Sequence, residues 1–120
     1  MKIKNNNGTI AAIIEKDQMV NSVQDILDII ADAVFTHQCK GVIIYKESLG
    51  EDFFNLKTGY AGEILQKFSN YHLKVAIIGD FGGYTSKSLR DLIYESNNGN
   101  RVFFKGTLEE GIAALESAGG

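Results

Sequence analysis

Gly41-Val-Ile-Ile-Tyr45 and Lys74-Val-Ala-Ile-Ile78 are two apolar runs without the polar alternation of a half-exposed strand. Strands that are covered on both faces have this pattern, so both runs are predicted to be buried strands of a parallel sheet. Similar runs occupy residues 9–15 and 101–105, and residues 1–4 precede the first of them as the arm of a hairpin. The sequence therefore predicts a mostly parallel central sheet of four to five strands.

Apolar residues at helical spacing fill the segments between these strands. They recur from Val23 to Val34, in a helix that ends before Gly41, then from about Thr58 to Tyr71, and from Leu89 to Ser96. The last helix begins after the capping pair Thr107 and Glu110. Strands that alternate with about four helices, after an N-terminal hairpin, are typical of an α/β fold.

Length and composition limit the class of protein. The 120 residues, of which 44% are hydrophobic, can bury a core, and we expect residues 1–120 to form a single domain with a flexible Gly119-Gly120 end. The lone Cys39 excludes a disulfide framework and favours a reducing cytoplasm. With 12 basic against 15 acidic residues and no long apolar run, we expect neither nucleic-acid nor membrane binding.

Two long loops follow the buried strands, at the edge where ligands bind in open α/β sheets. The loop at 46–59 exceeds the usual length of such connections, which is a sign of function. It contains Phe53 and Phe54, and burial in the core beneath the loop is favoured over a role as an aromatic ligand platform.

The second loop, at 79–91, joins a carboxylate at a strand end to glycines and a hydroxyl-rich helix start. Backbone N–H groups near Ser86, together with Lys87 and Arg90, could bind a phosphate or a carboxylate. The glycine pattern matches neither a dinucleotide fingerprint nor a P-loop. The favoured interpretation is that Thr85 or Ser86 caps the helix and that the glycines make the turn.

Carboxylates follow three predicted strands, namely Glu15, Glu47 and Asp80. Close together they could form an acid–base or metal cluster, but the sequence does not fix their separation. The two histidines and Cys39 lack partners at metal-ligand spacing. We therefore expect no metal, no cofactor and no catalysis.

The segments 51–71 and 86–97, together with Ala76-Ile-Ile-Gly-Asp-Phe81, resemble a small bacterial family catalogued as domain of unknown function 4180. The resemblance covers nearly the whole chain, and the family carries no established reaction. The order of strands and helices is also similar to the STAS, or anti-sigma-factor-antagonist, fold, at the level of the fold alone.

The STAS resemblance implies a phosphorylated serine in a D-S-S-G segment before the second helix. The matching stretch here is Glu47-Ser-Leu-Gly50, so Leu49 stands in the place of that serine. Ser48 or Thr58 could substitute, because a phosphate at a helix N-terminus is electrostatically favourable.

The sequence thus favours a cytoplasmic STAS-like regulatory domain that binds a protein partner or a small anionic ligand. A domain that forms a homodimer is a further option. The alternative is a phosphate- or carboxylate-binding protein, or a small enzyme, that uses Asp80 and Glu47 with Lys87 or Arg90. The residues that we expect to form the binding edge are Glu47, Ser48, Phe53, Phe54, Thr58, Asp80, Tyr84, Ser86, Lys87 and Arg90.

Overall fold

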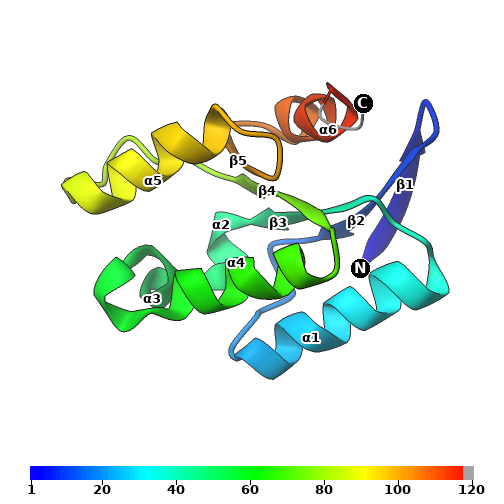
Figure 1. Cartoon of the computed structure of the whole chain (residues 1–120), viewed down its shortest axis with the longest axis horizontal. Coiled ribbons are helices and arrows are strands. Elements are labelled where there is room, and N and C mark those ends of the chain that lie inside the picture. The colour runs from blue at the N-terminus through cyan, green and yellow to red at the C-terminus, as the bar shows by residue number, and fades with distance from the viewer. Residues whose placement is uncertain (118–120) are drawn as a thin grey trace.

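The computed structural model describes residues 1–117, which form one five-stranded sheet and the helices that cover it (Figure 1). The expected glycine end, Gly119-Gly120, lies outside the described residues. The strands are β1 (Lys2–Asn6), β2 (Thr9–Ile14), β3 (Gly41–Tyr45), β4 (Lys74–Ile78) and β5 (Val102–Lys105). The α-helices are α1 (Val23–Ala31), α2 (Lys46–Leu49), α3 (Glu51–Phe54), α4 (Tyr60–Asn70), α5 (Lys87–Asn97) and α6 (Leu108–Ser117).

The sheet has the order β1-β2-β3-β4-β5, with β1 antiparallel to β2 and the other neighbours parallel. The hairpin is closed by Asn7 and Gly8, whose φ angles of 55° and 87° are those of a type I′ turn. This confirms the mostly parallel α/β class with an N-terminal hairpin, whose arm extends to Asn6.

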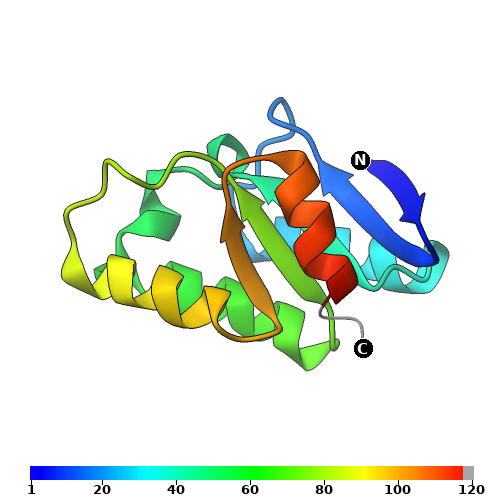
Figure 2. The same ribbon diagram turned by 90° about the horizontal axis from the view of Figure 1, so that it is seen from above.

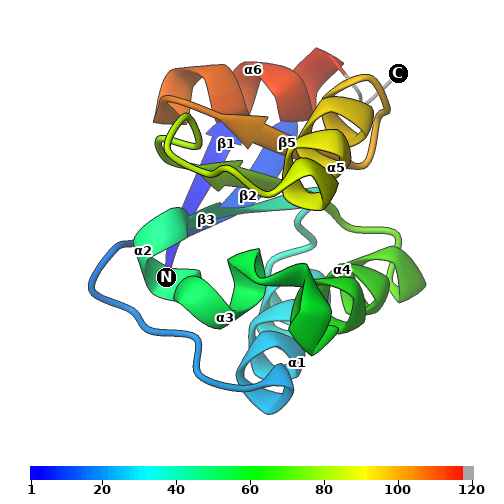
Figure 3. The same cartoon turned by 90° about the vertical axis from the view of Figure 1, so that its left-hand side faces the viewer.

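Two cores lie on opposite faces of the sheet, because successive residues of a strand point to opposite sides. On β4, Val75 and Ile77 belong to the larger core, under α1, α3, α4 and α5. Ala76 and Ile78 belong to the smaller core, which Leu115 of α6 completes. Figure 3 shows α6 on one side of the sheet and α1, α3 and α4 on the other, and Figure 2 shows α6 lying along β4.

The structure adds detail that periodicity alone does not give. Residues 46–59 were expected as a loop, but they wind into α2, α3 and a short 3-10 helix, η2 (Leu56–Thr58), which raises the α-helix count of residues 1–117 from about four to six. The first helix continues beyond α1 as a π-helix, η1 (Asp32–Thr36). No helix in the described residues is long and apolar enough to cross a membrane.

Candidate functional site

The loops that follow β3 and β4 are fixed against each other at the carboxyl edge of the sheet. Nζ of Lys46, at the start of α2, donates to the backbone carbonyl of Asp80 at 3.0 Å and lies 4.6 Å from the ring centroid of Tyr84. Gly79 is required at this contact, since a Cβ built there would lie 2.7 Å from Cβ of Lys46. The two loops therefore behave as one unit.

Aromatic rings also pack the two loops against each other. Phe54 stacks on Tyr84, with ring centroids 5.3 Å apart, and lies 6.0 Å from Phe81, which in turn meets Phe104 of β5 edge-to-face at 5.3 Å. Phe53 and Phe54 are both buried, with exposed fractions of 0% and 4%. This confirms the favoured interpretation that they plug into the core.

A hollow of about 580 Å³ opens between α3 and the start of α5, and we call it the α3–α5 hollow. Its lining comes from the two loops and from η2: Glu51, Asp52, Phe54, Asn55, Leu56, Lys57, Tyr84, Ser86 and Ser88. Of the ten residues expected at the binding edge, Phe54, Tyr84 and Ser86 line it. Within residues 1–117 the strand order never reverses, so the hollow lies beside the sheet and not in a crevice at a point of reversal.

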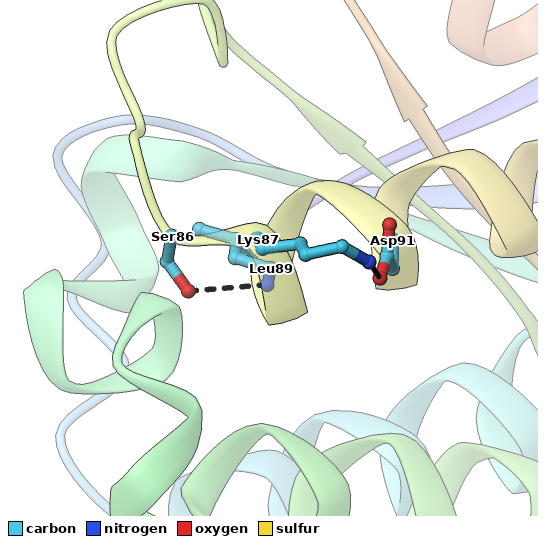
Figure 4. A network of polar contacts seen from close by, with 4 residues as sticks. All are labelled: Ser86, Lys87, Leu89 and Asp91. Atoms are coloured by element: carbon cyan, nitrogen blue, oxygen red, sulfur yellow. Dashed lines mark hydrogen bonds and ion pairs between the residues drawn. The ribbon is translucent and has the colours of Figure 1, made fainter.

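Ser86 and Lys87 are engaged within α5 itself (Figure 4). Oγ of Ser86 accepts from the backbone N–H of Leu89 at 3.3 Å, which is the capping role favoured from the sequence. Nζ of Lys87 donates to Oδ2 of Asp91 at 2.7 Å, and this bond raises the pKa of the lysine. Lys87 and Arg90 border a different hollow, of about 510 Å³, together with Asp91 and Tyr94.

The residues of the 46–59 loop that we expected at the binding edge have different surroundings. Ser48 is fully buried, and its Oγ donates to the backbone carbonyl of Glu15 at 2.8 Å. Glu47, next to it, is exposed. Oγ1 of Thr58 contacts the backbone carbonyls of Asp52 and Asn55, at 3.0 and 2.9 Å, and accepts from the N–H of Tyr60.

Asp80 and the other strand-end carboxylates have separate contacts. Oδ1 of Asp80 accepts from the backbone N–H of Gly82 at 2.9 Å, so the carboxylate shapes its own turn. Glu15 forms an exposed ion pair with Lys2 at 3.4 Å. Within residues 1–117 there is no group of three or more His, Cys, Asp and Glu side chains that could hold a metal ion.

Besides Lys87, two groups have raised pKa values: Cys39, before the start of β3, and Tyr60, at the start of α4. Burial, and next the charge of Asp32, raise the pKa of the Cys39 thiol above its ordinary 9.0. Burial, followed by the charges of Asp25, Asp52 and Glu63, raises the pKa of the Tyr60 phenol above 10.0. The hydroxyls of Tyr60 and Tyr84 are buried without a hydrogen-bond partner in the described part of the chain.

Sequence reasoning missed much of the lining of the α3–α5 hollow. Glu51, Asp52, Lys57 and Ser88 were each visible in the two long loops and at the start of α5, but they carry no motif. The one sequence feature that pointed to them was the length of the 46–59 segment. Unusual length indicates a functional loop, but it does not show which side chains of the loop face outward.

Comparison with known families and proteins gives one match. The family model described as Domain of unknown function (DUF4180) matches residues 5–115. No curated protein and no solved structure matches the chain.

Proposed function

The chain belongs to the DUF4180 family, and from this premise we propose that it is a non-catalytic regulatory module of the bacterial cytoplasm that binds a partner protein at the α3–α5 hollow. The observation that carries the proposal is the fixed pairing of the two loops that border the hollow, through the contacts of Lys46 with Asp80 and of Phe54 with Tyr84. A STAS-like architecture is part of the proposal and rests on the order of strands and helices.

Preorganisation supports this use of the hollow. A surface that is already ordered loses little conformational entropy on binding, so more of the contact energy appears as affinity. Tyrosine is among the residues that contribute most at protein interfaces, and the ring of Tyr84 is held between Phe54 and Lys46. The volume of about 580 Å³ is also that of a site for a side chain or a small ligand.

A small anionic ligand is the second candidate, favoured by the hydroxyls of Ser86 and Ser88 and by Lys57 in the lining. Glu51 and Asp52 oppose it, because two carboxylates repel a phosphate or a carboxylate. Titration calorimetry with inorganic phosphate and with acetate separates the candidates: heat that saturates and is lost on Lys57→Ala supports the anion site.

Ser88→Trp is the test of partner binding, since Ser88 is exposed on α5 and a tryptophan there fills the hollow without entering the core. The matched control is Ala113→Trp, on the exposed side of α6. Affinity purification from the source cells is then quantified by mass spectrometry. We expect a partner that is retained by the control and lost with Ser88→Trp. Equal recovery with both variants would refute the site, and sedimentation of the purified chain tests the homodimer option.

A further inference from the structure

The α3–α5 hollow is the first of three neighbouring hollows that share lining residues. A second hollow of about 520 Å³ shares Glu51 and Asp52 with it and continues past Thr58 and Tyr60 to Asn21. A third, of about 480 Å³, shares Asn21 with the second and runs along α1. We call these three hollows together the acidic groove.

Each of the three hollows has apolar side chains in its lining, next to polar ones. Met19 is 50% exposed in the third hollow, beside Ile29 of α1. Val20, Leu49 and Tyr60 line the second, and Phe54 and Tyr84 line the first. The unpartnered hydroxyls of Tyr60 and Tyr84 are buried in these walls.

The charge of the groove is strongly one-sided. Five carboxylates line it, from Asp25, Asp28, Asp32, Glu51 and Asp52, against two cationic residues, Lys57 and the N-terminal Met1 with its α-ammonium group. Asp25 accepts from the backbone N–H of Asn21, and Asp28 accepts from the side-chain amide of Gln24. Both donors are neutral, so Asp25 and Asp28 keep their negative charge, whereas Asp32 lies 3.9 Å from Nε2 of His37 and would be partly neutralised by a protonated imidazole.

The aspartates of α1 repel one another along the helix, although Asp25, in the first turn, is favoured by the helix dipole and by the hydrogen bond from the N–H of Asn21. Asp25, Asp28 and Asp32 follow one another at spacings of three and four residues, which brings like charges together on one face. Asp32 lies within the continuous helix, which runs on as η1 to Thr36, so no helix end separates it from Asp28. Residues that break a local stability rule are typical of functional surfaces.

We propose that the acidic groove binds a cationic segment of a partner protein, with Lys or Arg side chains at the carboxylate rim and at least one large apolar side chain between Met19 and Tyr60. The inference rests on the proposed partner-binding function and names the chemistry of that partner. Charge complementarity selects this occupant: five carboxylates against Lys57 and the Met1 ammonium leave a net negative lining, which repels an acidic segment and steers a basic one toward the groove.

The test uses a phage-displayed library of random peptides, selected on the full chain. We expect enriched peptides with at least two Lys or Arg residues and a large apolar residue. The best peptide is then labelled with fluorescein and titrated by anisotropy. Enrichment of acidic or purely apolar peptides, or of no peptide, would overturn the proposal.

Matched variants separate specific docking from general attraction to an acidic protein. Asp28→Asn with Asp52→Asn removes two charges from the groove, and Glu95→Gln with Glu109→Gln removes two exposed charges elsewhere. We expect about tenfold weaker peptide binding for the groove pair alone, with an affinity that falls as salt is added. Equal affinities of the two pairs would overturn the cationic partner.

Two further readouts distinguish the ways of failing. If Ser88→Trp blocks the peptide but the groove pair does not, the α3–α5 hollow binds partners and the charge argument is wrong. If neither variant has an effect, the proposed function fails as well. A dimer of the wild-type chain that the groove pair dissociates in sedimentation would identify a second copy as the occupant and so overturn the inference.

Discussion

The side-chain amide of Asn97 pairs with the backbone of Phe104 through two hydrogen bonds: the N–H of Phe104 donates to Oδ1 at 2.8 Å, and Nδ2 donates to the carbonyl at 3.1 Å. Asn97 ends α5, and Phe104 lies in β5, which is the last strand of the sheet. The amide thus takes the place of a neighbouring strand at an edge that would otherwise offer unpaired groups to another chain.

Asn97→Ala is therefore expected to destabilise the fold by about 2 kcal/mol, because both backbone groups are partly buried and lose their partner. Urea unfolding followed by circular dichroism measures the change. The control is Asn100→Ala, at an exposed position of the following turn, which should change stability by less than about 0.5 kcal/mol. Equal effects of the two substitutions would show that the amide pairing contributes nothing.

Gly79→Ala is expected to separate the two loops of the site. A Cβ at this position would lie 2.7 Å from Cβ of Lys46, so the backbone must move, at a cost of about 1–3 kcal/mol. In the control, Gly83→Ala, a Cβ has nothing within 4 Å. Thermal unfolding gives the stability, and a near-ultraviolet circular dichroism spectrum reports the packing of the aromatic rings, of which Tyr84, Phe54 and Phe81 lie at these loops. An unchanged spectrum and melting temperature for Gly79→Ala would contradict the close contact.

Ser48→Ala tests the buried hydroxyl that the sequence placed at the binding edge. The substitution removes the hydrogen bond that Oγ of Ser48 donates to the backbone carbonyl of Glu15. We therefore expect the free energy of unfolding to fall by about 1–2 kcal/mol. Ser88→Ala, at an exposed position, is the control and should be near neutral. If Ser48→Ala proves neutral while remaining folded, the hydroxyl does not hold the segment after β2.

The strands and the four longer helices were predictable from the sequence because each obeys a short-range rule, whereas α2, α3 and η2, in the segment predicted as a loop, were not. Gly41–Tyr45 lacks polar alternation since both of its faces are covered, and the Asn7-Gly8 pair is a turn signal that the local backbone alone explains. The π-helix at Asp32–Thr36 carries no such signal, and the periodicity of the apolar residues continues through it.

The site was readable only in part, because it depends on contacts between distant segments. Ser48 turns inward and Glu47 does not, because Oγ of Ser48 donates to the backbone carbonyl of Glu15, more than thirty positions away in the sequence. The acidic groove exists because the segment before α1 packs beside α2 and α3, where the N–H of Val20 donates to the carbonyl of Ser48 at 2.8 Å. No pattern within either segment encodes that packing.

Alkaline pH is expected to destabilise the fold through Cys39 and Tyr60. Both groups have pKa values raised in the folded state, mainly by burial, so folding favours their protonated forms. Their contribution is complete below the ordinary pKa values of 9.0 and 10.0 and is lost as the pH rises through the folded values, because the unfolded chain then releases protons more readily.

Urea unfolding between about pH 7 and pH 11 measures this loss. Tyr60→Phe keeps the ring and removes the ionisable hydroxyl, so its stability should fall less steeply above pH 10 than that of the wild type. Tyr71→Phe, which removes a phenol hydroxyl at an exposed position, is the control. Parallel curves for Tyr60→Phe and the wild type would contradict this prediction. They would mean that the Tyr60 phenol ionises as easily in the folded chain as in the unfolded chain, which requires that water reach its hydroxyl.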